Sequence, residues 1–86
     1  MAERQIPAGW SEVEVDGIPQ LQKLYKFKNF VEALAFTNKV GDLAEAFNHH
    51  PAITTEWGKV QVCWWTHTER GISALDLDMA QRCNDL

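Results

Sequence analysis

The chain contains three histidines, and their spacing along the sequence places the carboxylate of Glu45 close to two of them. His49 and His50 are adjacent, Glu45 lies four residues before His49, and His67 follows later in the chain. Imidazole groups have an ordinary pKa near 6.5 and transfer protons well at neutral pH. A glutamate four residues before a histidine on a helix shares its face and can accept from the imidazole N–H, which selects the tautomer. These residue types and spacings predict an acid–base site.

Three other interpretations of the same residues stay open. The three histidines and Glu45 could hold zinc, although side chains at adjacent positions diverge, which disfavours His49 and His50 as joint ligands. Cys63 could act as a nucleophile beside His67, but its thiol is expected to be buried. A histidine at a helix end can also be no more than a cation at the negative end of the helix dipole.

The first positioning element is a hairpin. Residues 10–15 alternate between two sides, with Trp10 on one of them, and residues 16–19 carry the Gly and Pro of a turn. Residues 21–27 bring a second, half-buried strand. Two strands joined by a short turn predict a β-hairpin.

A long amphipathic helix should follow. Asn29 is a good N-cap residue, and Glu32 three residues later completes the pattern of a capping box. Apolar residues then recur at spacings of three and four, which is the stripe of a helix packed on one side. Pro51 disfavours helical geometry at His50, so the helix should end by about His49.

Residues 53–67 predict a second hairpin with its turn at Gly58-Lys59. In that register Ile53 stands opposite Trp64, and the pairing extends to place His50 opposite His67. Directly opposed side chains have Cβ atoms about 5 Å apart. The hairpin would therefore bring His67 to the two histidines at the end of the helix.

Ser73 and Asp76 form a second capping-box pattern and open a final helix, with Leu75, Met79 and Cys83 as its buried stripe. The element order β-β-α-β-β-α predicts an α+β fold of two layers. A four-stranded antiparallel sheet would carry both helices on one face. Cys63 and Trp65 would lie on the other face, where a second subunit could cover them.

Composition limits the function classes. The 86 residues are 45% apolar and carry a net charge of −4, so we expect a single domain over residues 1–86 that does not bind nucleic acid directly. No apolar stretch reaches the roughly 20 residues that cross a bilayer. The start of the chain shows no secretory pattern, so we expect a cytoplasmic protein with reduced thiols.

One further set of residues resembles a known signature. The pattern of a carboxylate, His-His-Pro, an aromatic residue, a histidine and an aspartate is similar to that of the pterin-4a-carbinolamine dehydratases. It is carried by Glu45, His49-His50-Pro51, Trp57, Thr66-His67, Gly71-Ile72-Ser73 and Asp76. The likeness covers about residues 10 to 82. Family members commonly have a helix before the position of Trp10, and here we expect that helix to be reduced or absent.

The resemblance implies a hydro-lyase that converts 4a-hydroxytetrahydropterin to quinonoid dihydropterin and water, in the recycling of tetrahydrobiopterin after aromatic amino acid hydroxylation. It implies no metal and no redox cofactor. It also implies a homodimer or homotetramer, with a functional link to an aromatic amino acid hydroxylase. Some relatives of this family are binding proteins, acting as coactivators or assembly factors, which is the alternative function.

The same resemblance suggests roles for individual residues. His49 and His67 would be the acid–base pair, and His50 would position substrate and share in proton transfer. Glu45 and Asp76 would orient the imidazoles, with Asp76 expected to face His67. The substrate-binding residues would be Asn48, Pro51, Trp65 and Thr66.

Overall fold

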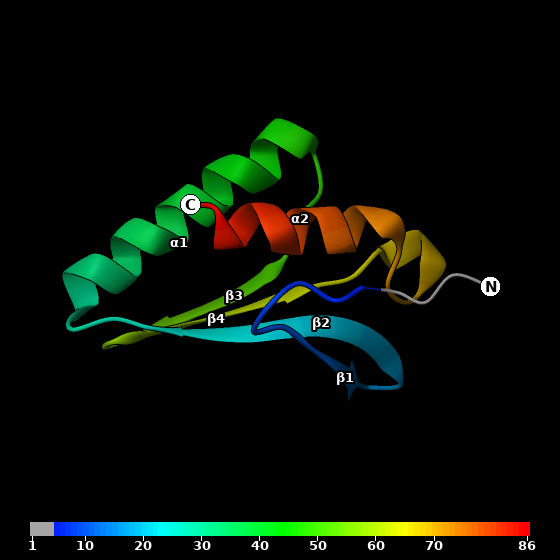
Figure 1. Cartoon of the computed structure of the whole chain (residues 1–86), viewed down its shortest axis with the longest axis horizontal. Coiled ribbons are helices and arrows are strands. Elements are labelled where there is room, and N and C mark those ends of the chain that lie inside the picture. The colour runs from blue at the N-terminus through cyan, green and yellow to red at the C-terminus, as the bar shows by residue number, and fades with distance from the viewer. Residues whose placement is uncertain (1–4) are drawn as a thin grey trace.

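The computed structural model describes residues 5–86 and shows one antiparallel sheet beneath two helices (Figure 1). The strand order in the sheet is β1-β2-β4-β3, and both helices cover the same face. The elements are β1 (Ser11–Val15), β2 (Ile18–Lys26), α1 (Phe30–Phe47), β3 (Ala52–Glu56), β4 (Lys59–Trp64), the 3₁₀ turn η1 (His67–Glu69) and α2 (Ala74–Asn84). The predicted two-layer α+β fold is confirmed. Residues 5–10 form no helix, and the rest of that prediction lies outside the described residues.

The first hairpin turns more tightly than the sequence suggested. Asp16 and Gly17 alone make the turn, both with positive φ (52° and 80°), and β2 already begins at Ile18. A two-residue turn of this kind matches the twist of the flanking strands. Aspartate and glycine are among the residues that tolerate the left-handed region, which explains their places.

The cap of α1 is confirmed at Asn29, whose side-chain oxygen accepts from the backbone N–H of Glu32 at 2.9 Å. The Glu32 carboxylate reaches back past the cap and accepts from the N–H of Lys28 at 3.3 Å. The Asn29 side chain therefore satisfies one of the N–H groups that the first turn leaves without an intrahelical partner, and the helix begins where the pattern predicted.

The predicted register of the second hairpin is wrong by two residues. The turn is Trp57-Gly58, so Ile53 pairs with Val62 and not with Trp64. Gly58 has a φ of 71° and occupies the second turn position, where a positive φ is required, whereas the prediction placed the glycine first. Because the shift is two residues, Ile53, Val62 and Trp64 keep their predicted face.

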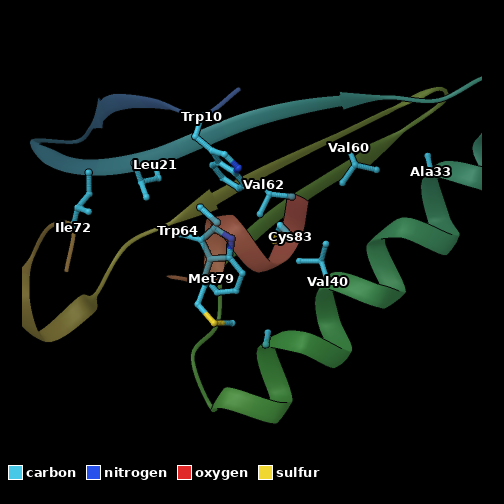
Figure 2. Packing of buried hydrophobic residues seen from close by; sticks show 12 residues of the cluster. Trp10, Leu21, Ala33, Val40, Val60, Val62, Trp64, Ile72, Met79 and Cys83 are labelled. Carbon is cyan, nitrogen blue, oxygen red and sulfur yellow. The ribbon is translucent and has the colours of Figure 1, made fainter. Parts of the chain in front are cut away.

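The core lies between the sheet and the helices (Figure 2). Side chains from the inner sheet face meet residues of both helices, and the fully buried ones include Leu21, Val40, Val60, Val62, Trp64, Met79 and Cys83. Leu75 was predicted to belong to this stripe and is instead 37% exposed. The adjacent Asp76 is completely buried in its place, because α2 presents its first turn to the histidines rather than to the apolar core.

The opposite sheet face is covered less than the inner one, but Cys63 does not depend on a partner for burial. Within the single chain it is 6% exposed, and its sulfur accepts from the Gln22 side chain at 3.5 Å. Trp65 is half-buried and packs against His67. Cover of these two residues by a second subunit stays a prediction.

Candidate functional site: a histidine pocket at the end of helix α1

The end of α1 delivers His49 and His50 to the site. Asn48 follows the last helical residue with left-handed backbone angles (φ 49°, ψ 43°), and its N–H donates to the carbonyls of Ala44 and Glu45. Asparagine tolerates this conformation better than most residues and ends many helices. Pro51 keeps the next residues extended, so the chain leaves the helix and the two imidazoles point to different partners.

All three histidines line one pocket of about 240 Å³. Its wall is formed by Asn48, His49, His50, Thr66, His67 and Thr68. This volume is below the ~300–1,000 Å³ of sites for drug-sized ligands, so the pocket suits a small molecule. Sequence reasoning did not single out Thr68, whose only signal is that it follows His67 in the chain.

The first carboxylate–histidine pair is buried. His49 Nε2 lies 2.6 Å from Asp76 Oδ1, with the two side chains 11% and 0% exposed. The His49 ring also stacks on the Trp64 indole, with centroids 5.6 Å apart and planes 11° from parallel. Hydrogen bonding and stacking together fix both the position and the plane of this imidazole.

The protonation of this pair follows from its hydrogen bonds. Asp76 Oδ2 accepts from the Thr66 hydroxyl at 2.7 Å and from the Ser73 N–H at 2.8 Å. A carboxylate that accepts from these donors leaves Oδ1 to accept from His49 as well. We therefore assign the proton of His49 to Nε2, which leaves Nδ1 for a ligand.

The second pair is exposed. His50 Nε2 lies 2.5 Å from Glu45 Oε2, with side chains 53% and 77% exposed. Glu45 was predicted to face His49, and this is wrong. The i,i+4 rule needs both residues on a continuous helix, and the left-handed Asn48 turns His49 away from that face.

His67 occupies the third wall without a carboxylate partner among the described residues. Its ring packs on Trp65, with centroids 4.8 Å apart and planes 34° from parallel. The predictions that His67 stands opposite His50 in the sheet and pairs with Asp76 are both wrong. The strand β4 ends at Trp64, and His67 begins the η1 turn. The pocket nevertheless contains all three imidazoles, as the sequence predicted.

Two of the four residues expected to bind substrate line the pocket, and two do not. Asn48 and Thr66 line the pocket, whereas Pro51 and Trp65 are not among its lining residues. The backbone N–H of Thr66 donates to the Gly71 carbonyl at 2.8 Å. Its own carbonyl accepts from Glu69 and Gly71, so the main chain of Thr66 is used within the loop.

The alternative chemistries find less support in the geometry. Within residues 5–86, no three His, Cys, Asp or Glu side chains converge in a group able to hold a metal ion. Cys63 is buried on the far side of β4 from the core and contacts Gln22. In the same range of the chain, no helix is both long and apolar enough to cross a membrane.

Comparison with known proteins identifies the family. The family model for pterin 4 alpha carbinolamine dehydratase matches residues 1–86. The chain belongs to the pterin 4 alpha carbinolamine dehydratase family. Two relatives, from Microcystis aeruginosa and Hahella chejuensis, both bear the name "Putative pterin-4-alpha-carbinolamine dehydratase". They are 57% and 54% identical over 90% and 92% of this chain, which spans 66% and 70% of their lengths.

Solved structures agree with the dehydratase fold. A transcriptional coactivator/pterin dehydratase from Brucella melitensis is 35% identical and superimposes with a TM-score of 0.80, over 91% of this chain and 81% of its own. A pterin dehydratase-like protein described as a RuBisCO assembly factor in the alpha-carboxysome has a TM-score of 0.75. That second protein is 21% identical over 92% of this chain and 89% of its own, so it supports the fold alone.

The aromatic residue of the dehydratase signature lies far from the pocket in the hairpin. Trp57 sits in the β3–β4 turn and is 69% exposed. The pocket forms at the opposite end of the hairpin, where β3 begins and β4 ends. The aromatic member of the motif therefore does not contact the histidines of its own chain.

Proposed function

We propose that this chain dehydrates 4a-hydroxytetrahydropterin to quinonoid dihydropterin by general acid–base catalysis from its histidines, in the recycling of tetrahydrobiopterin. The observation that carries the proposal is the single pocket lined by His49, His50 and His67. Family membership supports the substrate class. Aromatic amino acid hydroxylases release 4a-hydroxytetrahydropterin, so this chain would be linked to these enzymes by using their product as its substrate.

The reaction breaks a C–O bond and an N–H bond and releases one water. One group must protonate the departing hydroxyl, and another must take the proton from the ring nitrogen. His49 is the base in this proposal, because its Nε2–H is held by Asp76 and its Nδ1 is left to accept a proton. The buried carboxylate would stabilise the imidazolium that forms, as in other Asp–His pairs.

His67 is then the acid that protonates the hydroxyl, because it lines the same pocket without being tied to a carboxylate of the described chain. His50 borders the pocket on a third side and would position the substrate. After each turnover the proton gained by His49 must return to His67, and the exposed position of His67 lets solvent carry it.

The decisive experiment is a stopped-flow absorbance assay with freshly generated 4a-carbinolamine. Replacing His49 and His67 together with alanine should reduce the rate to that of buffer, while circular dichroism shows an unchanged fold. A double variant that keeps most of the wild-type rate would refute the assignment. Dialysis against a strong chelator should leave the rate unchanged, and a loss that zinc restores would favour the metal alternative.

A non-catalytic binding module is the second candidate function. The observation that favours it is the apolar outer side of α1, where Phe30, Val31 and Leu34 are 44%, 75% and 44% exposed. One solved relative is described as a transcriptional coactivator as well as a pterin dehydratase. If the wild-type protein does not accelerate dehydration over buffer, the binding module becomes the better conclusion.

We also propose that the chain forms a homodimer or homotetramer through this side of α1, since exposed apolar side chains on a helix favour burial against a partner. Sedimentation velocity should show a defined oligomer in the wild type and a smaller species for Leu34→Glu. A wild-type protein that sediments as a monomer at micromolar concentration would contradict this proposal.

A further inference from the structure

Two hydroxyl groups lie behind the buried carboxylate, on the side away from His49. Thr66 Oγ1 and Ser73 Oγ are 2.7 Å apart, and Thr66 Oγ1 is 2.7 Å from Asp76 Oδ2. Ser73 Oγ is also 3.2 Å from the same carboxylate oxygen. Each hydroxyl has one proton to donate, so the three contacts cannot all be hydrogen bonds at once.

Counting protons assigns the direction of the chain of hydrogen bonds. The shorter contacts are satisfied together when Ser73 donates to Thr66 and Thr66 donates to Asp76. The Ser73 backbone N–H adds a second donor to Oδ2 at 2.8 Å. Oδ2 is thereby occupied by the two donors, and Oδ1 is the oxygen that faces His49.

Thr66 also holds the loop that carries His67. Its backbone pairs with Gly71 as an isolated antiparallel bridge, with Thr66 N–H donating to the Gly71 carbonyl at 2.8 Å. The η1 turn lies between these two residues. One residue therefore joins the loop of His67, through its main chain, to the carboxylate that orients His49, through its hydroxyl.

We propose that Thr66 is a positioning residue, supported by Ser73, that fixes Asp76 and hence the tautomer and direction of His49. The proposal rests on the proposed dehydratase function for its kinetic consequence. It differs from the substrate-binding role expected for Thr66 from the sequence, because the hydroxyl proton is committed to Asp76 and is not offered to a ligand.

Three variants of the full-length protein test the role by kinetics. Thr66→Val removes the hydroxyl and keeps the shape, and should lower kcat about tenfold with KM within about twofold, since the hydrogen bond that is lost joins Thr66 to the charged Asp76 and not to the substrate. Thr66→Ser restores the hydroxyl and should recover most of kcat. Ser73→Ala, which removes the outer proton donor together with the N-cap side chain of α2, should give a smaller loss of kcat than Thr66→Val.

The matched control is Thr37→Val. Thr37 Oγ1 lies 2.6 Å from Thr55 Oγ1 between α1 and β3, which is a hydroxyl pair of similar geometry away from the pocket. This variant should keep wild-type kcat even where its melting temperature falls. The proposal is overturned if Thr66→Val keeps wild-type kcat, if Thr66→Ser is equally impaired, or if only KM rises, which would return Thr66 to a substrate contact.

A measurement without substrate separates this inference from the proposed function. Two-dimensional ¹⁵N NMR of the histidine rings should show the His49 proton on Nε2, and Thr66→Val should shift that signal while Thr37→Val should not. A wild-type His49 protonated on Nδ1 alone, or a Thr66→Val spectrum identical to the wild type, would overturn the positioning role. If Thr66→Val does not fold, Ser73→Ala provides the same comparison. Absence of dehydratase activity in the wild type would refute the proposed function and leave the NMR test standing.

Discussion

The two histidine–carboxylate pairs of the pocket have the same chemistry and opposite surroundings. His49 and Asp76 are 11% and 0% exposed, whereas His50 and Glu45 are 53% and 77% exposed. Asp76 has its second oxygen bound by Thr66 and Ser73, but no other contact to the Glu45 carboxylate is found in residues 5–86. Exposed ion pairs contribute little because water screens them, while a buried pair that loses one partner leaves an uncompensated polar group.

This difference assigns unequal tasks to adjacent histidines. The buried pair is held rigidly enough to define one tautomer, and the exposed pair can exchange its partner for water at little cost. Adjacent positions in the sequence do not determine which of the two histidines belongs to the buried pair and which to the exposed pair. This assignment is determined by the left-handed turn at Asn48 and by the buried start of α2, where Asp76 lies.

The largest expected effect is that of Asp76→Asn. The amide keeps the size of the side chain but removes the negative charge that holds His49, so kcat should fall about 100-fold, within the range that acid–base groups contribute. Stopped-flow dehydration kinetics, with circular dichroism to confirm folding, measure it. A loss below about threefold would mean that the buried pair does not direct catalysis.

Glu45→Gln is the matched change in the exposed pair and should lower kcat by less than about threefold. The comparison is tested by which of the two variants loses more kcat. If Glu45→Gln proves as damaging as Asp76→Asn, the two pairs are functionally equivalent and burial does not distinguish them.

A smaller effect tests burial on α2 independently of the histidines. Burial raises the pKa of the Cys83 thiol from 9.0 to about 11, so the folded state keeps its proton at a pH where the unfolded chain loses it. This contribution to stability is present below pH 9 and is lost as the pH rises towards 11. Burial raises the pKa of the Tyr25 phenol as well, which adds a loss of the same sign.

Thermal unfolding between pH 8 and pH 10.5 measures this effect. The melting temperature should fall with rising pH, and the fall should be shallower in Cys83→Ala, which retains Tyr25. Dehydratase activity of Cys83→Ala at neutral pH should match the wild type, because Cys83 is in the core and not in the pocket. Equal pH slopes in the two proteins would contradict a buried, protonated thiol.

The fold was predictable because its signals are local. Asn29 and Ser73 mark the helix starts, the apolar spacing marks α1, and glycine marks each hairpin turn. The register of the second hairpin was not predictable, since the sequence is compatible with a two-residue turn at Trp57-Gly58 or at Gly58-Lys59. Only the backbone angle that the sheet imposes on Gly58 separates them. The error of two residues left Ile53, Val62 and Trp64 on their predicted face but moved Trp57 from a strand into the turn.

The composition of the site was predictable, but the partners within it were not. The sequence indicated that His49, His50 and His67 converge, and they line one pocket. The sequence assigned each carboxylate to the wrong histidine: Glu45 binds His50 and not His49, and Asp76 binds His49 and not His67. The i,i+4 rule for Glu45 fails once Asn48 leaves the helix. The partner of Asp76 depends on how α2 docks beside the end of α1, and no local pattern encodes that docking. Thr66 and Ser73 stood in the signature and Ser73 in a capping pattern, but nothing in the sequence indicated that their hydroxyls contact Asp76 together.

The central claim is that a pterin ring binds among the three histidines with Nδ1 of His49 facing it. A crystal soaked with a reduced pterin tests this most directly. The account predicts density for the bicyclic ring between His49, His50 and His67, with Nδ1 of His49 within hydrogen-bond distance of a ring nitrogen and Nε2 still bound to Asp76. A ring bound elsewhere on the molecule, or a His49 that releases Asp76 to contact the ring through Nε2, would contradict it.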